Sequence, residues 1–243
     1  MTNKLLKYTF VSEVPKDFVV LPAFLGGERG EYIHNEVVKK YGKINDLVTA
    51  NINFSDGIVK GSKPGYVVAV NEILREEGLR TATQADLEKV LREKSLKLEG
   101  SYEDSALVLG SKGESNSYSY LAEHLASQIS KDKDYPIMIP LTEVNLVEDS
   151  NSPYGLVFDL RKDAQVIYAL ILNNGGKFKS TNEDTGLPMQ LGEGNRTLFV
   201  RDSDLSRLCL YNGFDLYSGY GDFAGLRNDG RVVVCGWVTV SKF

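Results

Sequence analysis

The order of helical and strand patterns constrains the fold of this chain more than any other feature of its sequence. Apolar residues recur at helical spacing over residues 31–41, 66–77 and 120–129, and Thr83 precedes a further helix as its N-cap. Short apolar runs typical of strands lie at 106–109, 137–141, 156–160, 165–172, 197–200 and 232–240, around a polar insertion at 173–195. A few helices early and strands late, without βαβ alternation, predict an α+β fold with mostly antiparallel strands.

The length of the chain suits one large domain or two small ones, because 243 residues can bury a substantial core. No internal repeat or low-complexity linker divides the sequence. We therefore expect a single domain over residues 1–243. Within that domain, residues 1–65 could form a peripheral N-terminal elaboration.

The charge balance and the lack of long apolar runs exclude several classes of partner. The chain carries 28 Lys and Arg against 33 Asp and Glu, a net charge of −5, whereas non-specific nucleic-acid binding needs clustered basic residues. No apolar run approaches the length of a membrane helix, so we expect no membrane insertion. The first residues lack the apolar core of a signal peptide. We expect a virion surface location if the protein is viral, and otherwise a cytoplasmic protein or one exported by an unknown route.

Residue types that carry catalysis are present without the spacing that catalysis needs. His34 and His124 lie in separate predicted helices, and neither has a partner at metal-ligand spacing. Cys209 and Cys235 fit no metal motif and are expected to be free thiols. The glycine-rich residues 26–30 lack the Lys-Ser/Thr of a phosphate-binding loop. We predict no catalytic residue, no cofactor and no metal, and hence a protein that is not an enzyme.

The segment 205–235, LSRLCLYNGFDLYSGYGDFAGLRNDGRVVVC, has an unusual composition. It is rich in Tyr, Asn, Asp, Gly and Ser, and it lacks Lys, Glu, Gln, Met and Trp, which make up roughly one residue in six of the chain. Tyr gives rigid amphipathic contact area, and the small polar residues give adaptable hydrogen bonds, as in binding surfaces. An ordinary loop and strand region is the alternative interpretation.

Two parts of the sequence resemble the formylglycine-generating-enzyme type of C-type lectin fold. They are residues 74–94, LREEGLRTATQADLEKVLREK, and the closing GRVVV at 230–234. The resemblance implies a C-type lectin-like fold in which one helix leads through a turn into a second helix. The turn at residues 80–83 lacks the proline of that group, and Gly230-Arg231 lacks its phenylalanine. Cys209 and Cys235 do not stand in the context of its catalytic cysteine pair, so its copper-dependent activity is not implied.

A closer resemblance, from residue 80 to 234, is to the variable proteins of diversity-generating retroelements, particularly archaeal and archaeal-virus members. The residues that carry it are YEDSALVL, PIMIPL, NSPYGLVFDLRKDA, IYALILN, TGLP, GEGNR and DLSRLCL. In that family a reverse transcriptase rewrites the end of the gene and turns AAC codons into NNC codons. Such codons never encode Lys, Glu, Gln, Met or Trp, the five types that residues 205–235 lack.

The resemblance implies that residues 205–235 combine fixed and varied positions. Scaffold positions are expected at Ser206, Arg207, Leu208, Leu210, Leu216, Ala224, Gly230, Val232, Val233 and Val234. Varied, ligand-facing positions are expected at Tyr211, Asn212, Asp215, Tyr217, Ser218, Tyr220, Asp222, Arg227, Asn228 and Asp229. Gly213, Gly219, Gly221 and Gly225 are open to being either varied positions or turn glycines.

Three functions remain open. The favoured hypothesis is a ligand-binding or receptor-binding protein whose C-terminal surface recognises a protein or a cell-surface target. The alternative is a formylglycine-generating-enzyme-like oxidase or small-ligand-binding protein, which predicts a deep pocket with perturbed cysteines or a bound metal. A third possibility is a structural virion protein without a diversified ligand.

Overall fold

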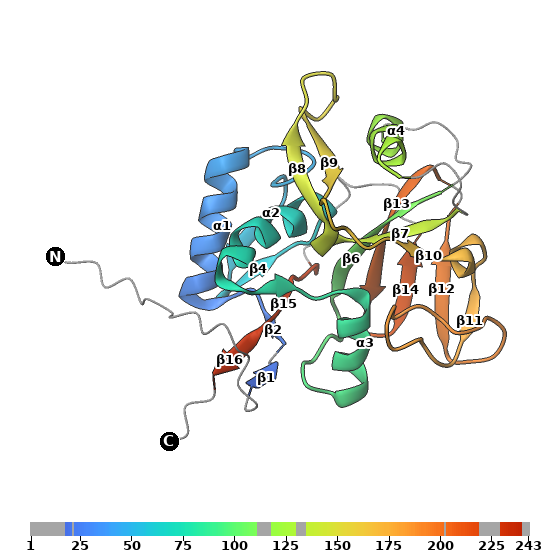
Figure 1. Cartoon of the computed structure of the whole chain (residues 1–243). Helices are drawn as coiled ribbons and strands as arrows, with labels where there is room; N and C mark the ends of the chain where they lie inside the picture. Colours follow the sequence, from blue (N-terminus) through green and yellow to red (C-terminus); the bar gives the residue numbers. More distant parts are fainter. Residues whose placement is uncertain are drawn as a thin grey trace.

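The chain folds as a mixed α+β protein, as its sequence predicts. The computed structural model describes residues 18–20, 22–110, 118–129, 135–201, 203–218 and 229–239. Within these ranges four α-helices form, three of them before residue 94, and Figure 1 shows them around a large curled sheet. The helices are α1 Gly27–Tyr41, α2 Pro64–Leu74, α3 Gln84–Glu93 and α4 Ser119–Ser127.

The largest sheet has seven strands in the order β10-β7-β6-β13-β14-β12-β11. Its neighbours pair antiparallel, apart from the parallel pair β12 and β14, so the expectation of mostly antiparallel strands is confirmed. The strands are β6 Tyr102–Leu109, β7 Ile137–Pro140, β10 Ile167–Tyr168, β11 Gly176–Phe178, β12 Arg196–Val200, β13 Leu205–Tyr211 and β14 Asp215–Ser218.

The connection between the two edge strands shows why this sheet must curl. A flat sheet of this width would separate β10 from β11 by about 29 Å, which is about the reach of a fully extended chain of eight steps. Yet Tyr168 and Gly176 are joined by a segment that contains the short 3-10 helix η3, Leu170–Asn173. The edges therefore approach each other, and Leu172 of η3 joins the core while Leu170 stays exposed.

Smaller sheets complete the fold. The strands β2 Ala23–Phe24, β15 Val233–Cys235 and β5 Arg80–Thr81 form one sheet in that order. Three two-stranded sheets are formed by β1 Phe18–Val20 with β16 Trp237–Thr239, by β3 Asn53–Ser55 with β4 Ile58–Lys60, and by β8 Val144–Glu148 with β9 Leu156–Leu160.

Two apolar clusters lie on opposite faces of the large sheet. The first joins α1, α2, α4 and the β8–β9 hairpin to Leu107 and Leu109 of β6. The second joins α3 and η3 to Ala106 and Val108 of the same strand, so β6 separates the two cores. Residues 22–65 share the first cluster, to which they contribute Leu25, Ile33, Val37, Leu47, Val48, Ile52 and Val59. This part of the N-terminal region is therefore integral to the core.

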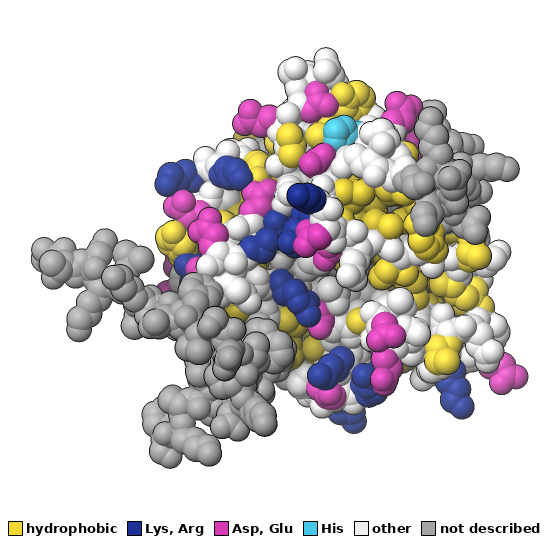
Figure 2. Space-filling view, viewed as in Figure 1, with side chains coloured by type: hydrophobic (Ala, Val, Ile, Leu, Met, Phe, Trp, Pro, Cys, Tyr) yellow, Lys and Arg dark blue, Asp and Glu magenta, His cyan; other side chains and the backbone are white. Residues whose placement is uncertain are grey.

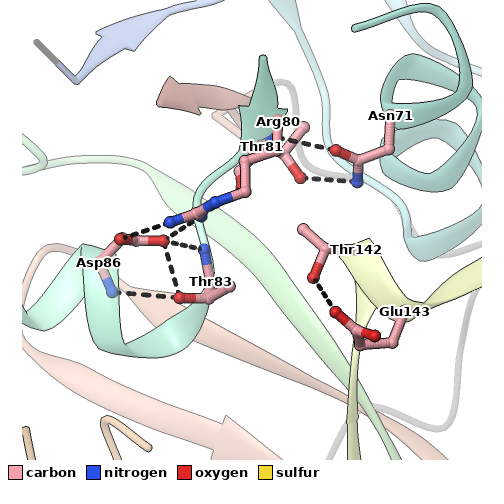
Figure 3. A network of polar contacts seen from close by, with 7 residues as sticks. All are labelled: Asn71, Arg80, Thr81, Thr83, Asp86, Thr142 and Glu143. Carbon is pink, nitrogen blue, oxygen red and sulfur yellow. Dashed lines mark hydrogen bonds and ion pairs between the residues drawn. The ribbon is translucent and has the colours of Figure 1, made fainter. Parts of the chain in front are cut away.

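The ends of α3 follow local rules that the sequence makes visible. Thr83 is its N-cap, and a capping box joins the Thr83 and Asp86 side chains to each other's backbone N–H groups. Arg80 forms an ion pair with Asp86, as Figure 3 shows. Asn71, fully buried in α2, donates to Thr81 Oγ1 at 2.8 Å and accepts from the Thr81 N–H at 2.8 Å. These contacts fix the turn at residues 80–83, and we assign them a structural role.

The structure differs from the expected elements in four places. The strand expected over residues 165–172 is limited to Ile167–Tyr168, and a 3-10 helix follows, because an apolar run alone does not separate a strand from a buried helical turn. The helix expected over residues 31–41 begins at Gly27, where the Gly30 N–H donates to Gly26 O at 2.8 Å. The strand β8 is not apparent in the sequence. The helix expected over residues 66–77 ends at Leu74, and the short 3-10 helix η1, Arg75–Glu77, follows it.

Candidate functional site

The first part of the unusual C-terminal segment, residues 205–218, folds as a β-hairpin inside the large sheet. Strands β13 and β14 are joined by residues 212–214, and the Phe214 N–H donates to Tyr211 O at 3.0 Å. Asn212 and Gly213 have φ values of 55° and 61°, a left-handed conformation that Asn and Gly adopt most readily. A Cβ atom on Gly213 would lie 2.9 Å from the carbonyl carbon of Leu98. Gly213 is therefore a turn glycine.

Side chains of the hairpin alternate between the core and the opposite face. Leu208, Leu210 and Leu216 are fully buried, as expected of scaffold positions. Asp215 and Tyr217 are only half-buried, because successive residues of a strand point to opposite faces. Ser218 corrects our expectation of an outward side chain. It lies on the Leu216 face with 2 % exposure, and its Oγ is 3.3 Å from Ser206 Oγ.

An aromatic cluster occupies the outward face of this hairpin. The ring of Tyr217 stacks on Phe199 of β12 with centroids 4.3 Å apart, and Tyr211 meets it edge-on at 5.0 Å. Phe199 remains 38 % exposed, and both tyrosines are half-buried. We did not predict Phe199, which lies outside residues 205–235. Its alternation with the buried Leu198 was the only sequence signal for its position.

A shallow hollow of about 470 Å³ lies beside the aromatic cluster, around the turn of the hairpin. Two of its residues, Glu99 and the 40 % exposed Phe214, are absent from our predicted positions. Glu99 belongs to another part of the chain, which sequence spacing alone does not connect to the turn. The hollow is lined by Glu99, Tyr211, Asn212, Gly213, Phe214 and Asp215.

Two of the predicted ligand-facing side chains hold the turn in place. Asn212 Oδ1 accepts from the Gly100 N–H at 2.8 Å, and Asp215 Oδ1 accepts from the Thr197 N–H at 2.6 Å. Changing either side chain removes a hydrogen bond to a backbone donor, at a cost of about 1 kcal/mol. The structure therefore gives Asn212 and Asp215 a supporting role in addition to their position at the hollow.

A buried ion pair supports the turn from below. Arg196 donates to both carboxylate oxygens of Glu88 at 2.6 Å each, and its Nε donates to the Phe214 carbonyl at 2.5 Å. The guanidinium also lies over the ring of Phe178, 4.6 Å from its centroid. Through Arg196, α3 and the Phe178 ring fix the backbone of the hairpin turn.

The remaining predicted positions divide into described and undescribed residues. Asp229 is half-buried, and Gly230 is confirmed as scaffold because a Cβ there would lie 2.4 Å from the Ser62 nitrogen. Ser206, Arg207, Val232 and Val233 are buried, and Val234 packs partly against the core. Tyr220, Asp222, Ala224, Arg227 and Asn228, together with Gly219, Gly221 and Gly225, lie outside the described residues.

The two cysteines are free and buried. Burial raises the pKa of Cys209 to about 12 and that of Cys235 to about 11, so both thiols stay protonated at neutral pH. Cys235 packs in the second apolar cluster with Leu208 and Leu210, whereas Cys209 alternates with these leucines and points to the other face. This arrangement provides no reactive thiol pair of the kind that the oxidase alternative requires.

The histidines have partners within the fold. His34 Nδ1 lies 3.0 Å from the Tyr66 hydroxyl between α1 and α2, and burial lowers the pKa of His34. His124 lies 3.6 Å from Asp159. In the part of the chain that the structure describes, no group of three or more His, Cys, Asp or Glu residues could hold a metal ion. None of the helices described there is long and apolar enough to cross a membrane.

A second apolar surface lies near the β10 edge of the sheet. Figure 2 shows hydrophobic side chains gathered in the right half of the view, where β7, β10 and η3 lie in Figure 1. Tyr168 and Leu170 are 43 % and 57 % exposed. Because β10 lies at the edge of the sheet and β14 lies inside it, Tyr168 offers a control for tests of the hairpin.

Comparisons with models of protein families, with curated proteins and with solved structures find no match to this chain.

Proposed function

We propose that this chain is a ligand-binding protein that recognises a protein or a cell-surface target through the outward face of its β13–β14 hairpin. Its recognition surface, as defined here, comprises Phe199, Tyr211, Phe214 and Tyr217 with the hollow beside them. We further propose that a diversity-generating retroelement varies residues of this surface, in the manner of the variable proteins that the sequence resembles.

One observation carries this proposal: a partly exposed aromatic cluster lies on a hairpin whose other face is fixed in the core. Leu210 and Leu216 are fully buried on one face, while Tyr211 and Tyr217 contact each other on the opposite face. A rigid scaffold keeps the ordering cost of binding low. Large aromatic side chains are also the residues that most often dominate binding energy.

We also propose a C-type lectin-like fold, on the basis of how its two motifs lie in space. The turn at residues 80–83 and the closing segment at 230–234 are far apart in sequence. In the structure β5 pairs with β15, with Thr81 opposite Val234, and the Ala82 N–H donates to Val233 O at 2.8 Å. Contact between the two segments supports the resemblance built on them.

A binding screen tests the proposed function. The purified protein is presented to an array of cell-surface proteins and glycans, in parallel with the double variant Phe199→Ala/Tyr217→Ala and the control Tyr168→Ala. We expect one or more ligands that the control retains and the double variant loses by at least tenfold in Kd. Equal binding by all three proteins would place recognition elsewhere and contradict the proposal.

The neighbouring DNA provides a second test of the retroelement. We expect a near-copy of the codons for residues 205–235 that differs only where the copy has adenine, close to a reverse-transcriptase gene. Absence of both from the genome that encodes the chain would remove the diversification part of the proposal and leave ligand binding to the screen.

A further inference from the structure

Three carboxyl oxygens on or beside β6, the strand that pairs with β13 of the hairpin, are buried without a hydrogen-bond partner among the described residues. They are Glu103 Oε2, Asp104 Oδ1 and Asp229 Oδ1. Glu103 and Asp104, neighbours on β6, are only 1 % and 4 % exposed. An unsatisfied polar atom inside a protein costs free energy, and an ionised one costs more.

The segment that returns from the undescribed residues 219–228 is held on β6 beside these carboxyls. Gly230 lies alongside Tyr102 in a parallel bridge, and the Arg231 N–H donates to Tyr102 O at 2.9 Å. The Gly61 N–H donates to Gly230 O at 2.8 Å. Residues 229–231 lie at the C-terminal end of the positions predicted to vary. They contact Tyr102, and Glu103 is the next residue of the same strand.

The hairpin turn is hydrogen-bonded to Ser101, the residue that precedes Tyr102 in the chain. The Asn212 N–H donates to Ser101 O at 2.6 Å. The Ser101 hydroxyl lies 2.5 Å from Glu103 Oε1 and 2.9 Å from Leu98 O. A hydroxyl has one hydrogen, so Ser101 cannot donate to both oxygens. When Ser101 donates to Leu98 O, its oxygen can accept a hydrogen bond from a protonated Glu103 carboxyl. When Ser101 donates to Glu103 Oε1, it favours the ionised carboxylate.

Burial raises the pKa of both neighbouring carboxyls, Glu103 and Asp104, and nearby cations oppose the rise at Asp104. Arg207 of β13 lies 3.4 Å from Asp104 Oδ2, and Lys63 at the start of α2 also attracts Asp104. Burial is the largest effect on Glu103 and raises its pKa to about 8, and the negative charges of Asp104 and Asp229 act in the same direction. Ser101 and Arg231 partly oppose this rise.

We propose that the Glu103 carboxyl is a proton-controlled latch for the recognition surface. When Glu103 is protonated, both the turn at 212–214 and the return segment at 229–231 are seated on β6. When it loses the proton to solvent, both are loosened. The regulatory meaning of the latch rests on the proposed binding function, whereas its existence does not.

The direction of the effect follows from the contacts. Ionised Glu103 adds a buried negative charge beside Asp104 and Asp229, and the Ser101 hydroxyl compensates this only in part. Separation of residues 229–231 from β6 would admit water to the carboxylate and break the Arg231 bond to Tyr102. The surface is therefore most tightly held below the ordinary carboxyl pKa of 4.5, and it loosens progressively as the pH rises from there to about 8.

Hydrogen exchange tests the latch without any ligand. Protection factors, corrected for the pH dependence of intrinsic exchange, are measured between pH 6 and 9.5 for peptides covering 211–216 and 229–235. Wild type is compared with Glu103→Gln, which stays neutral, and with Glu99→Gln, which removes an exposed carboxylate beside the same turn. We expect at least a tenfold loss of protection between pH 6 and 8, levelling off above pH 8, in wild type and in Glu99→Gln, and none in Glu103→Gln.

Two outcomes would overturn the latch. One is protection that falls equally in wild type and Glu103→Gln. The other uses wild type alone and covers the case in which Glu103→Gln does not fold: carboxyl ¹³C NMR that shows Glu103 titrating near its ordinary value of 4.5. Because neither measurement involves a ligand, failure of the latch leaves the binding screen unaffected, and failure of the screen leaves the latch testable.

Discussion

The ion pair between Arg196 and Glu88 gives the sharpest test of how the β13–β14 hairpin is supported. The side chains of Arg196 and Glu88 are only 14 % and 5 % exposed, and two bonds of 2.6 Å join them. Replacing Arg196 by Met removes both bonds and the donor to Phe214 O, and leaves the Glu88 carboxylate buried. Breaking a buried pair in this way costs about 3–5 kcal/mol. Glu88 would still accept hydrogen bonds from Thr181 at 3.3 Å and from Gln84 at 3.2 Å. We therefore expect a loss of unfolding free energy at the lower end of this range, about 3 kcal/mol.

Urea denaturation of four proteins provides the measurement: wild type, Arg196→Met, Glu88→Leu and the double variant. The double variant has no unpaired charge at this site, so it should recover much of the stability that Arg196→Met loses. Lys89→Met is the control, because the exposed Lys89–Glu93 pair at 3.9 Å should contribute less than about 1 kcal/mol. A loss of unfolding free energy below about 1 kcal/mol for Arg196→Met would refute the reasoning, provided that the dependence of this free energy on urea concentration is unchanged.

Four further predictions follow from the turn, the buried carboxyl and the helix cap. Gly213→Ala should destabilise the protein by clearly more than Gly57→Ala, since both have positive φ but only Gly213 faces the Leu98 backbone; equal midpoints in urea would contradict this. The folded pKa of Glu103, about 8, exceeds its ordinary 4.5, so stability should fall as the pH rises between these values, by less than about 5 kcal/mol, and Glu103→Gln should flatten this fall in pH-dependent melts. Thr83→Ala should cost about 1 kcal/mol by loss of the N-cap. Burial, the largest effect, raises the pKa of Asp86, but the Arg80 and Thr83 bonds outweigh it and lower that pKa, so the acid-side loss of stability should weaken in Asp86→Asn.

Local elements were largely predictable because their signals lie within a few residues of one another. Thr83 and Asp86 form a capping box at a spacing of three, and Gly78 ends the second helical segment with a φ of 72°. The alternation of Leu208, Leu210 and Leu216 with polar residues correctly separated the two faces of the hairpin, apart from Ser218. The order of helices and strands was sufficient for the α+β class.

The parts that could not be predicted depend on residues far apart in the chain. Phe199 joins the aromatic cluster only because β12 pairs with β14, and Glu99 reaches the hollow only because the Gly100 N–H donates to Asn212. Glu103 and Asp104 look like surface residues of a strand by type alone. Their burial follows from Arg207 and the return segment, which lie more than a hundred residues away.

The position of β14 within the sheet has a consequence for aggregation. A strand at the edge of a sheet exposes backbone N–H and C=O groups, on which another chain can form a new strand. The strand β14 instead pairs with β12 on one side and with β13 on the other. Its backbone is therefore unavailable to other chains, whatever side chains its outward positions carry. A protein that acquires new residues at Tyr217 can thus sample apolar or β-prone substitutions without creating a template for intermolecular sheets.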